Sequence, residues 1–156
     1  MLLLLFEIGN GRYALDANQI VEIVPLVKLQ PIPITPDYVA GLMNYRGEAT
    51  PVIDLNQLFD SVNHENLLST RIIITKYPID GGDYRPLALI ANNVTETVRT
   101  RLDQAPPTGV FMDKSLFDDE TILETADMIQ WFDIKKMLPA HDIALLFKLD
   151  DQVFID

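Results

Sequence analysis

The chain has 156 residues, 48% of them apolar, and its formal net charge is −11. This length predicts one domain or two small lobes sharing a core, and the apolar share excludes wholesale disorder. The acidic balance argues against nucleic acid and anionic lipid surfaces, which require clustered Lys and Arg, and it favours a basic partner surface. Because the chain has no cysteine, disulfides and thiolate chemistry are excluded, and the cytoplasm is the simplest location.

The N-terminal segment is apolar but short. Residues 1–6 lack a basic flank, a long apolar core and a cleavage site, so they predict neither a signal peptide nor a membrane span. We therefore expect no direct insertion into a membrane. Leu2 to Ile8 instead predict a strand buried on both faces. Gly9-Asn10-Gly11-Arg12 indicates a hairpin turn, after which Tyr13 to Leu15 return as the second strand.

A capped turn, a strand and a proline-rich segment come next. Asp16 is expected to cap one helical turn. Ile20 to Pro25 have the composition of a strand, and Glu22 is the one charged residue inside it. The prolines between residues 25 and 36 exclude a long helix or a central strand from the segment that follows. Thr35-Pro36-Asp37 are expected to open a single helical turn.

The chain is organised around the stretch from Val39 to Leu55. Two apolar runs with strand composition flank a polar tip, Asn44 to Glu48, where Gly47 lets the chain reverse. Arg46 is therefore expected at an exposed corner, where its guanidinium is not needed for a core and can be read by another molecule. The alternative, which the turn by itself favours, is a solvated arginine paired with a neighbouring carboxylate.

The rest of the chain predicts further short strands and two short helices. Frequent turns between short strands indicate an all-β barrel or sandwich, with one small SH3-like or OB-like barrel in each half, residues 1–70 and 71–156. The predicted elements are a helical turn over residues 55–59 started by Asp54 or Asn56, a loop over 60–69, a turn over 80–83, strands over 71–76, 85–91, 94–101 and 126–132, an irregular segment over 102–124, a helix over 133–138 capped by Asp133, a last helix over 140–147, and an acidic tail over 150–156.

We find no motif that predicts catalysis, a cofactor or a metal site. His64 and His141 lie outside any recognisable nucleophile motif and are interpreted as solvated. Asp118-Asp119-Glu120 lack the alternation and glycine of a calcium loop and indicate a solvated acidic loop. Carboxylates are abundant, so a carboxylate-based hydrolase stays open as an alternative. A free-standing SH3-like module for an extended peptide is another, but it needs exposed aromatic residues around one groove, which 8% aromatic content does not indicate.

Several segments, taken together in this order and spacing, resemble a CheW-like domain. The resemblance spans about residues 4–147 and implies a mainly β fold, in which two packed, intertwined five-stranded SH3-like barrels form a single domain over residues 1–156. Short helical turns and a short C-terminal helix complete this implied fold. The segments are Gly11-Arg12-Tyr13-Ala14-Leu15-Asp16, Ile20-Val21-Glu22-Ile23, Gly41, Asn44-Tyr45-Arg46-Gly47, Pro51-Val52-Ile53-Asp54-Leu55, and then residues 87–98 and 128–138.

The resemblance also implies a function. Members of this family are non-catalytic adaptors that join the cytoplasmic tip of a chemoreceptor to the regulatory domain of a CheA-type histidine kinase, so the chain is expected at membrane-bound receptor arrays. Arg46 matches the family's turn arginine, implicated in this coupling, and Glu22 and Ile20 match strand residues at the same surface. Gly41 and Tyr45 complete the expected partner-binding set.

Tyr45 stands where the family usually has leucine. Together with the segments Leu3 to Gly9 and Ile23 to Val27, this tyrosine is most similar to the CheW-type couplers of Wsp-like surface-sensing systems. That similarity leaves two outputs open, motility control and cyclic-di-GMP synthesis.

Overall fold

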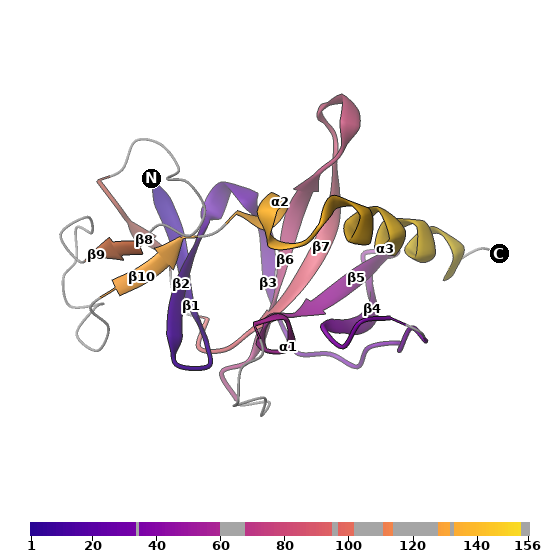
Figure 1. Ribbon diagram of the computed structural model, residues 1–156, viewed down its shortest axis with the longest axis horizontal. Coiled ribbons are helices and arrows are strands. Elements are labelled where there is room, and N and C mark those ends of the chain that lie inside the picture. Colours follow the sequence, from indigo (N-terminus) through magenta and orange to yellow (C-terminus); the bar gives the residue numbers. More distant parts are fainter. Residues whose placement is uncertain are drawn as a thin grey trace.

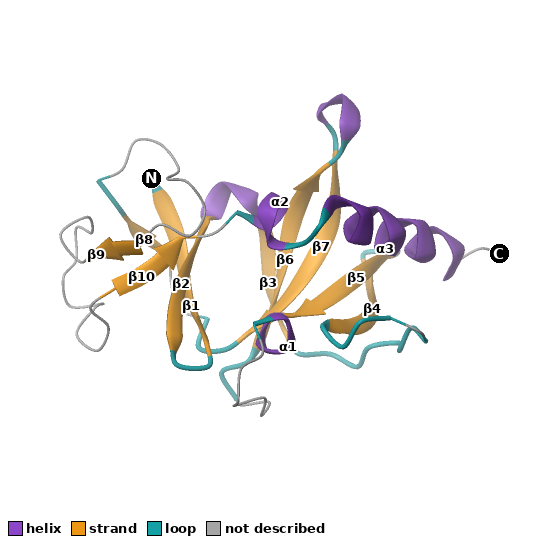
Figure 2. Cartoon of the chain, in the orientation of Figure 1, coloured by secondary structure: helices purple, strands orange, loops and turns teal. Residues whose placement is uncertain are grey.

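The structure is a computed structural model that describes residues 1–33, 35–59, 68–94, 97–101, 111–113, 128–131 and 133–153. Two five-stranded sheets dominate it, one on each side of the view in Figure 1, and Figure 2 shows how little of the described chain is helical. The predicted mainly β fold is thereby confirmed. The strands are β1 (Leu2–Ile8), β2 (Gly11–Asp16), β3 (Ile20–Pro25), β4 (Val39–Tyr45), β5 (Glu48–Asp54), β6 (Arg71–Pro78), β7 (Tyr84–Ala91), β8 (Thr97–Arg99), β9 (Phe111–Asp113) and β10 (Met128–Trp131).

The two sheets do not correspond to the two halves of the chain. The first sheet has the strand order β8-β1-β2-β10-β9 and the second has the order β3-β6-β7-β5-β4. β2 forms a hairpin with β1 and pairs in parallel with β10, so that Ala14 lies opposite Trp131. The prediction of one barrel in each half is therefore wrong, because a parallel pair joins strands that are distant in sequence.

Alternation along the strands divides the core into three clusters. Leu3 and Leu5 of β1 point into a cluster with Trp131, inside the first sheet. Leu4 and Phe6 point the other way, into a larger cluster between the two sheets. Ile72, Ile74 and other residues of β5, β6 and β7 form the third cluster, inside the second sheet. Successive side chains of a strand point to opposite faces, so β1 is buried on both faces as predicted.

Three short helical segments begin where aspartate caps were predicted. They are the 3-10 helix η1 (Ala17–Gln19), α1 (Leu55–Leu58) and α2 (Ile134–Met137). Asp16, Asp54 and Asp133 each accept a hydrogen bond from the backbone N–H two residues further on. A carboxylate in this position satisfies an N–H that lacks a partner within the helix. A further 3-10 turn, η2 (Asp80–Gly82), joins β6 to β7.

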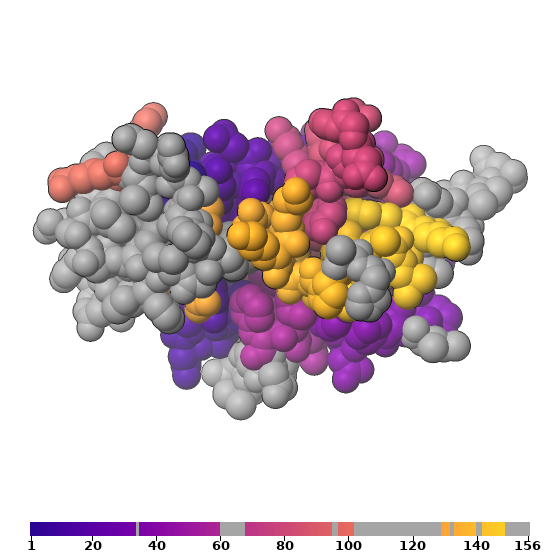
Figure 3. Space-filling model, turned by 45° about the horizontal axis from the view of Figure 1, so that its top comes forward, coloured from indigo at the N-terminus to yellow at the C-terminus, as the bar shows by residue number. Residues whose placement is uncertain are grey.

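The last helix, α3 (Ala140–Val153), is longer than predicted and continues through the start of the expected acidic tail. Its buried residues Ile143, Leu146 and Phe147 belong to the cluster between the sheets. The Arg85 guanidinium lies 4.7 Å from the centre of the Phe147 ring. Figure 3 shows α3 on the surface, beside the hairpin of β6 and β7. No helix in the described ranges has the length and apolar character needed to cross a membrane.

Some predictions differ from the structure or fall outside it. Residues 35–37 form no helical turn; instead the Val39 N–H donates to the Pro36 carbonyl at 3.0 Å, which makes a tight turn. The segment predicted as irregular contains β9, although most of it lies outside the described residues. Residues 60–67, with His64, and the acidic trio at 118–120 also lie outside them, as does the side chain of His141.

Candidate functional site

The tip of the hairpin formed by β4 and β5 is a turn of two residues, Arg46 and Gly47. Both have positive φ, 51° and 83°, as in the type I′ turn that matches the twist of a hairpin. The Asn44 side chain accepts a hydrogen bond from the Gly47 N–H at 2.8 Å and stiffens the turn. Such turns prefer Asn or Gly at the first position, and a left-handed conformation costs other residues about 1 kcal/mol. Arg46 is therefore held in a strained conformation.

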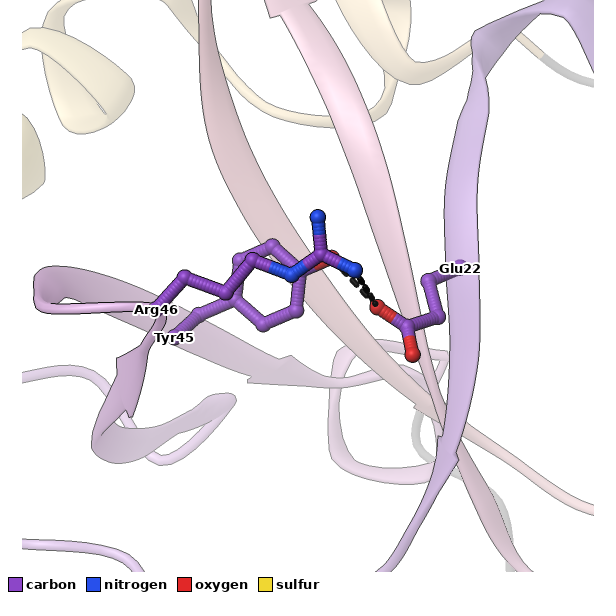
Figure 4. Close-up of polar contacts among 3 residues, drawn as sticks. All are labelled: Glu22, Tyr45 and Arg46. Carbon is purple, nitrogen blue, oxygen red and sulfur yellow. Dashed lines mark hydrogen bonds and ion pairs between the residues drawn. The ribbon is translucent and has the colours of Figure 1, made fainter.

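Arg46 forms a cluster with Glu22 and Tyr45 (Figure 4). One carboxylate oxygen of Glu22, Oε2, accepts from the Tyr45 hydroxyl at 2.5 Å and from Nη2 of Arg46 at 3.1 Å. The guanidinium carbon lies 5.3 Å from the centre of the Tyr45 ring. The Arg46 side chain is 73% exposed and that of Glu22 is 39% exposed. Arg46 is thus exposed at a corner, as predicted, and is also paired with a carboxylate, as the alternative interpretation expects, whereas its recognition by another molecule stays a prediction.

This cluster joins the two end strands of the second sheet. Glu22 lies on β3 and Tyr45 on β4, and these strands end the sheet on opposite sides. A backbone pair between Gln30 and Leu42, with both N–H···O distances at 2.8 Å, connects the chain after β3 to β4. The cluster thus helps to close the sheet on itself. The hydrogen bond to Glu22 raises the pKa of the Tyr45 hydroxyl, because the proton is needed for that bond.

A hollow of about 190 Å³ lies beside the cluster. Tyr84, which is 53% exposed, stands on its rim, and the Lys76 ammonium lies 5.6 Å from the centre of the Tyr84 ring. Sequence reasoning missed Tyr84 and Val21, although Tyr84 follows the predicted turn at residues 80–83 and so begins a strand at an exposed hairpin. The hollow is lined by Val21, Tyr45, Arg46, Glu48, Tyr84 and Pro86.

Two residues of the expected partner-binding set lie away from the cluster. The register of β3 shifts between Ile20 and Glu22, and Ile20 packs against the core between the sheets. Gly41 is buried with φ at 144°, and a Cβ atom there would lie 2.5 Å from the backbone oxygen of Gln30. Its need for glycine is therefore conformational. The structure brings together Glu22, Tyr45 and Arg46, and their contact with a partner stays a prediction.

The described residues contain no group of three or more His, Asp or Glu side chains placed to hold a metal ion. Comparison with known proteins identifies the family to which this chain belongs. The CheW-like domain matches residues 2–142, most of the chain. The chain belongs to the CheW-like domain family. Members of this family are non-catalytic scaffold or adaptor proteins of chemotaxis signalling, so this CheW-like protein is an adaptor and the hydrolase alternative is excluded.

Individual relatives agree with this assignment. The CheW-like chain is 26% identical to the Chemotaxis protein CheW of Klebsiella aerogenes, over 92% of this chain and 84% of that protein. It is 27% identical to the Chemotaxis protein CheW of Bacillus subtilis, over 87% of this chain and 85% of that protein. Its fold is similar to that of the scaffolding protein TtCheW from Thermoanaerobacter tengcongensis, with a TM-score of 0.68 at 23% identity, covering 90% of this chain and 89% of that one.

Proposed function

We propose that this CheW-like protein, acting as a single domain, couples the cytoplasmic tip of a chemoreceptor to the regulatory domain of a CheA-type histidine kinase in receptor arrays at the membrane. The observation that carries the proposal is the conformation of Arg46. It is an exposed arginine at a left-handed position in a tight turn. The turn joins two strands that pair along their length, from Val39 opposite Ile53 to Tyr45 opposite Glu48. Strained residues on rigid elements are concentrated at functional sites.

Stability alone does not account for an arginine at this position. In its ion pair with Glu22 the arginine side chain is 73% exposed and the glutamate side chain 39%, and pairs open to solvent contribute about 0.2–1 kcal/mol. The left-handed backbone costs about the same amount. Asn or Gly would form the turn without that cost. The guanidinium therefore brings little net stability, and a role in recognition supplies the reason to keep it.

The test is calorimetric titration of a receptor-tip fragment and of the kinase regulatory domain, separately, against the wild-type protein and its variants. Arg46→Ala should weaken binding of at least one partner about 30-fold, as expected for a central interface arginine that contributes about 2 kcal/mol. Arg46→Lys should restore binding only in part, because an ammonium cannot reproduce the planar fork of a guanidinium.

A matched control is Arg99→Ala, which removes an exposed arginine from the first sheet. This variant should bind both partners like the wild type. The proposal is wrong if wild-type protein binds neither partner, if Arg46→Ala binds both as tightly as wild type, or if Arg99→Ala weakens binding as much as Arg46→Ala does. Thermal unfolding of each variant shows whether a loss of binding reflects a loss of fold.

A further inference from the structure

Two hydrogen-bond donors in the cluster share a single acceptor atom. The Tyr45 hydroxyl and Nη2 of Arg46 both donate to Oε2 of Glu22. We propose that Tyr45 is a positioning residue, which keeps the Glu22 carboxylate in place when Arg46 leaves it to pair with an acidic side chain of the protein partner. This inference rests on the proposed coupling function and adds the chemistry of the partner group that Arg46 receives.

Arg46 has donors to spare. A guanidinium carries five N–H groups in a planar fork. Among the described residues, its polar contact is the one bond from Nη2 to Glu22, and its face lies over the Tyr45 ring. The side chain is mostly exposed at the edge of the hollow. A partner carboxylate that reaches this edge can be bound by two parallel N–H groups, the strongest arrangement for this pair of ions.

Such a partner competes with Glu22 for the guanidinium. When Arg46 turns away, the Glu22 carboxylate loses a charged donor although more than half of its side chain is covered. A partly covered carboxylate left without a donor is costly, and that cost would be subtracted from the partner's affinity. The Tyr45 hydroxyl stays on Oε2 and reduces the cost. Tyr45 also packs against the core of the second sheet, so the hydroxyl keeps its place while Arg46 moves.

The surroundings of the hollow favour an acidic group over a basic one. Val21, Tyr84 and Pro86 line it beside Arg46, and side chains that displace water from around an ion pair strengthen its attraction. Lys76, beside the Tyr84 ring, adds a second positive charge. Glu48 also lines the hollow and opposes an acidic group. Removing its charge therefore offers an independent test of the sign of the partner's charge.

The decisive experiment is a double-mutant cycle, with the receptor-tip fragment and the kinase regulatory domain as the titrated partners. Tyr45→Phe removes only the hydroxyl and should weaken binding about five-fold, the effect of a net hydrogen-bond contribution of ordinary size. In a Glu22→Gln background no carboxylate has to be held, so adding Tyr45→Phe should change the affinity less than about two-fold. Tyr84→Phe, which removes the other hydroxyl of the hollow, should bind like wild type.

Three other outcomes of this experiment would overturn the inference. If Tyr45→Phe weakens binding equally with and without the Glu22 carboxylate, the hydroxyl contacts the partner directly. If it has no effect in either background, the hydroxyl does not hold Glu22 during binding. If Tyr84→Phe weakens binding as much, the effect is not particular to Tyr45. Thermal unfolding of the two phenylalanine variants separates loss of affinity from loss of fold.

The charge of the partner group is tested with variants of this chain and with variants of the partner. Glu48→Gln should tighten binding by about two-fold or more, since it removes a repulsive charge, and weaker binding would exclude an acidic partner group. At least one Asp→Asn or Glu→Gln variant of the partner should bind wild-type protein more weakly than the unchanged partner does, yet bind Arg46→Ala with unchanged affinity. If no partner variant behaves in this way, Arg46 does not leave Glu22 for an acidic group of the partner. If the wild type binds neither partner, the proposed function is refuted. If Arg46→Ala weakens binding as expected but Tyr45→Phe does not, only this inference is refuted.

Discussion

Replacing Arg46 by asparagine separates the cost of its backbone conformation from the value of its side chain. Arg46 has φ at 51°, a conformation that asparagine adopts readily and that alanine and arginine do not. We expect Arg46→Asn to be as stable as wild type or more stable, and Arg46→Ala to be less stable. Both variants remove the guanidinium, so both should lose partner binding to the same extent.

The magnitudes follow from the contacts of Arg46. Truncation removes the exposed ion pair with Glu22 and the contact of the guanidinium with the Tyr45 ring, which together contribute about 0.5–1 kcal/mol. Asparagine recovers about 1 kcal/mol of backbone strain that alanine retains. The free energy of unfolding of the two variants should therefore differ by about 1 kcal/mol, which corresponds to about 3 °C in Tm for a chain of this size.

The assay is urea unfolding and differential scanning calorimetry of wild type, Arg46→Asn and Arg46→Ala under one set of conditions. Equal destabilisation by asparagine and alanine would show that the left-handed conformation is not a cost at this turn. A loss of several kcal/mol in either variant would show that the ion pair with Glu22 closes the second sheet, and that Arg46 is a structural residue.

Two further predictions concern residues outside the cluster. Gly41→Ala should lower the free energy of unfolding by about 3 kcal/mol, because a Cβ would meet the Gln30 backbone, whereas Gly47→Ala, with open space around it, should cost only about 1 kcal/mol; equal falls in Tm would contradict this. Burial, and then the hydrogen bond to Asp142, raise the pKa of Tyr38 from 10.0 to about 12. The folded state thus holds this proton more tightly, and stability should fall as pH rises from about 10 to about 12. An absorbance titration in which Tyr38→Phe leaves the late phenolate transition unchanged would refute it.

Local patterns in the sequence were enough to predict most of the elements and their caps. The apolar run Leu2–Ile8 gave β1 with its bounds, because a run buried on both faces has no polar alternation to obscure it. Asp16 and Asp133 were predicted as caps, and Asp54 as one of two candidates, because the bond that each accepts comes from a residue only two positions away in the chain. Arg46 was placed at an exposed turn for the same reason, since Gly47 is its neighbour.

Contacts between distant residues could not be predicted in this way. The parallel pair of β2 and β10 depends on which strand reaches an open edge, and neither strand carries that information alone. The approach of Glu22 to Arg46 depends on how the end strands of the second sheet close. The register shift in β3 turns Ile20 into the core, and a one-residue shift of this kind leaves no mark on composition.

The interleaved strand order determines when each sheet has all of its strands during synthesis. All strands of the second sheet lie between Ile20 and Ala91, so the sheet can form on the ribosome while β8, β9 and β10 are still being synthesised. β1 and β2 are made first, yet the edge of β2 is covered only when β10 arrives. Until then an apolar hairpin with an unpaired edge is exposed, a state that favours aggregation. We therefore expect translation of the last third of the chain to be the step at which this adaptor depends most on chaperones.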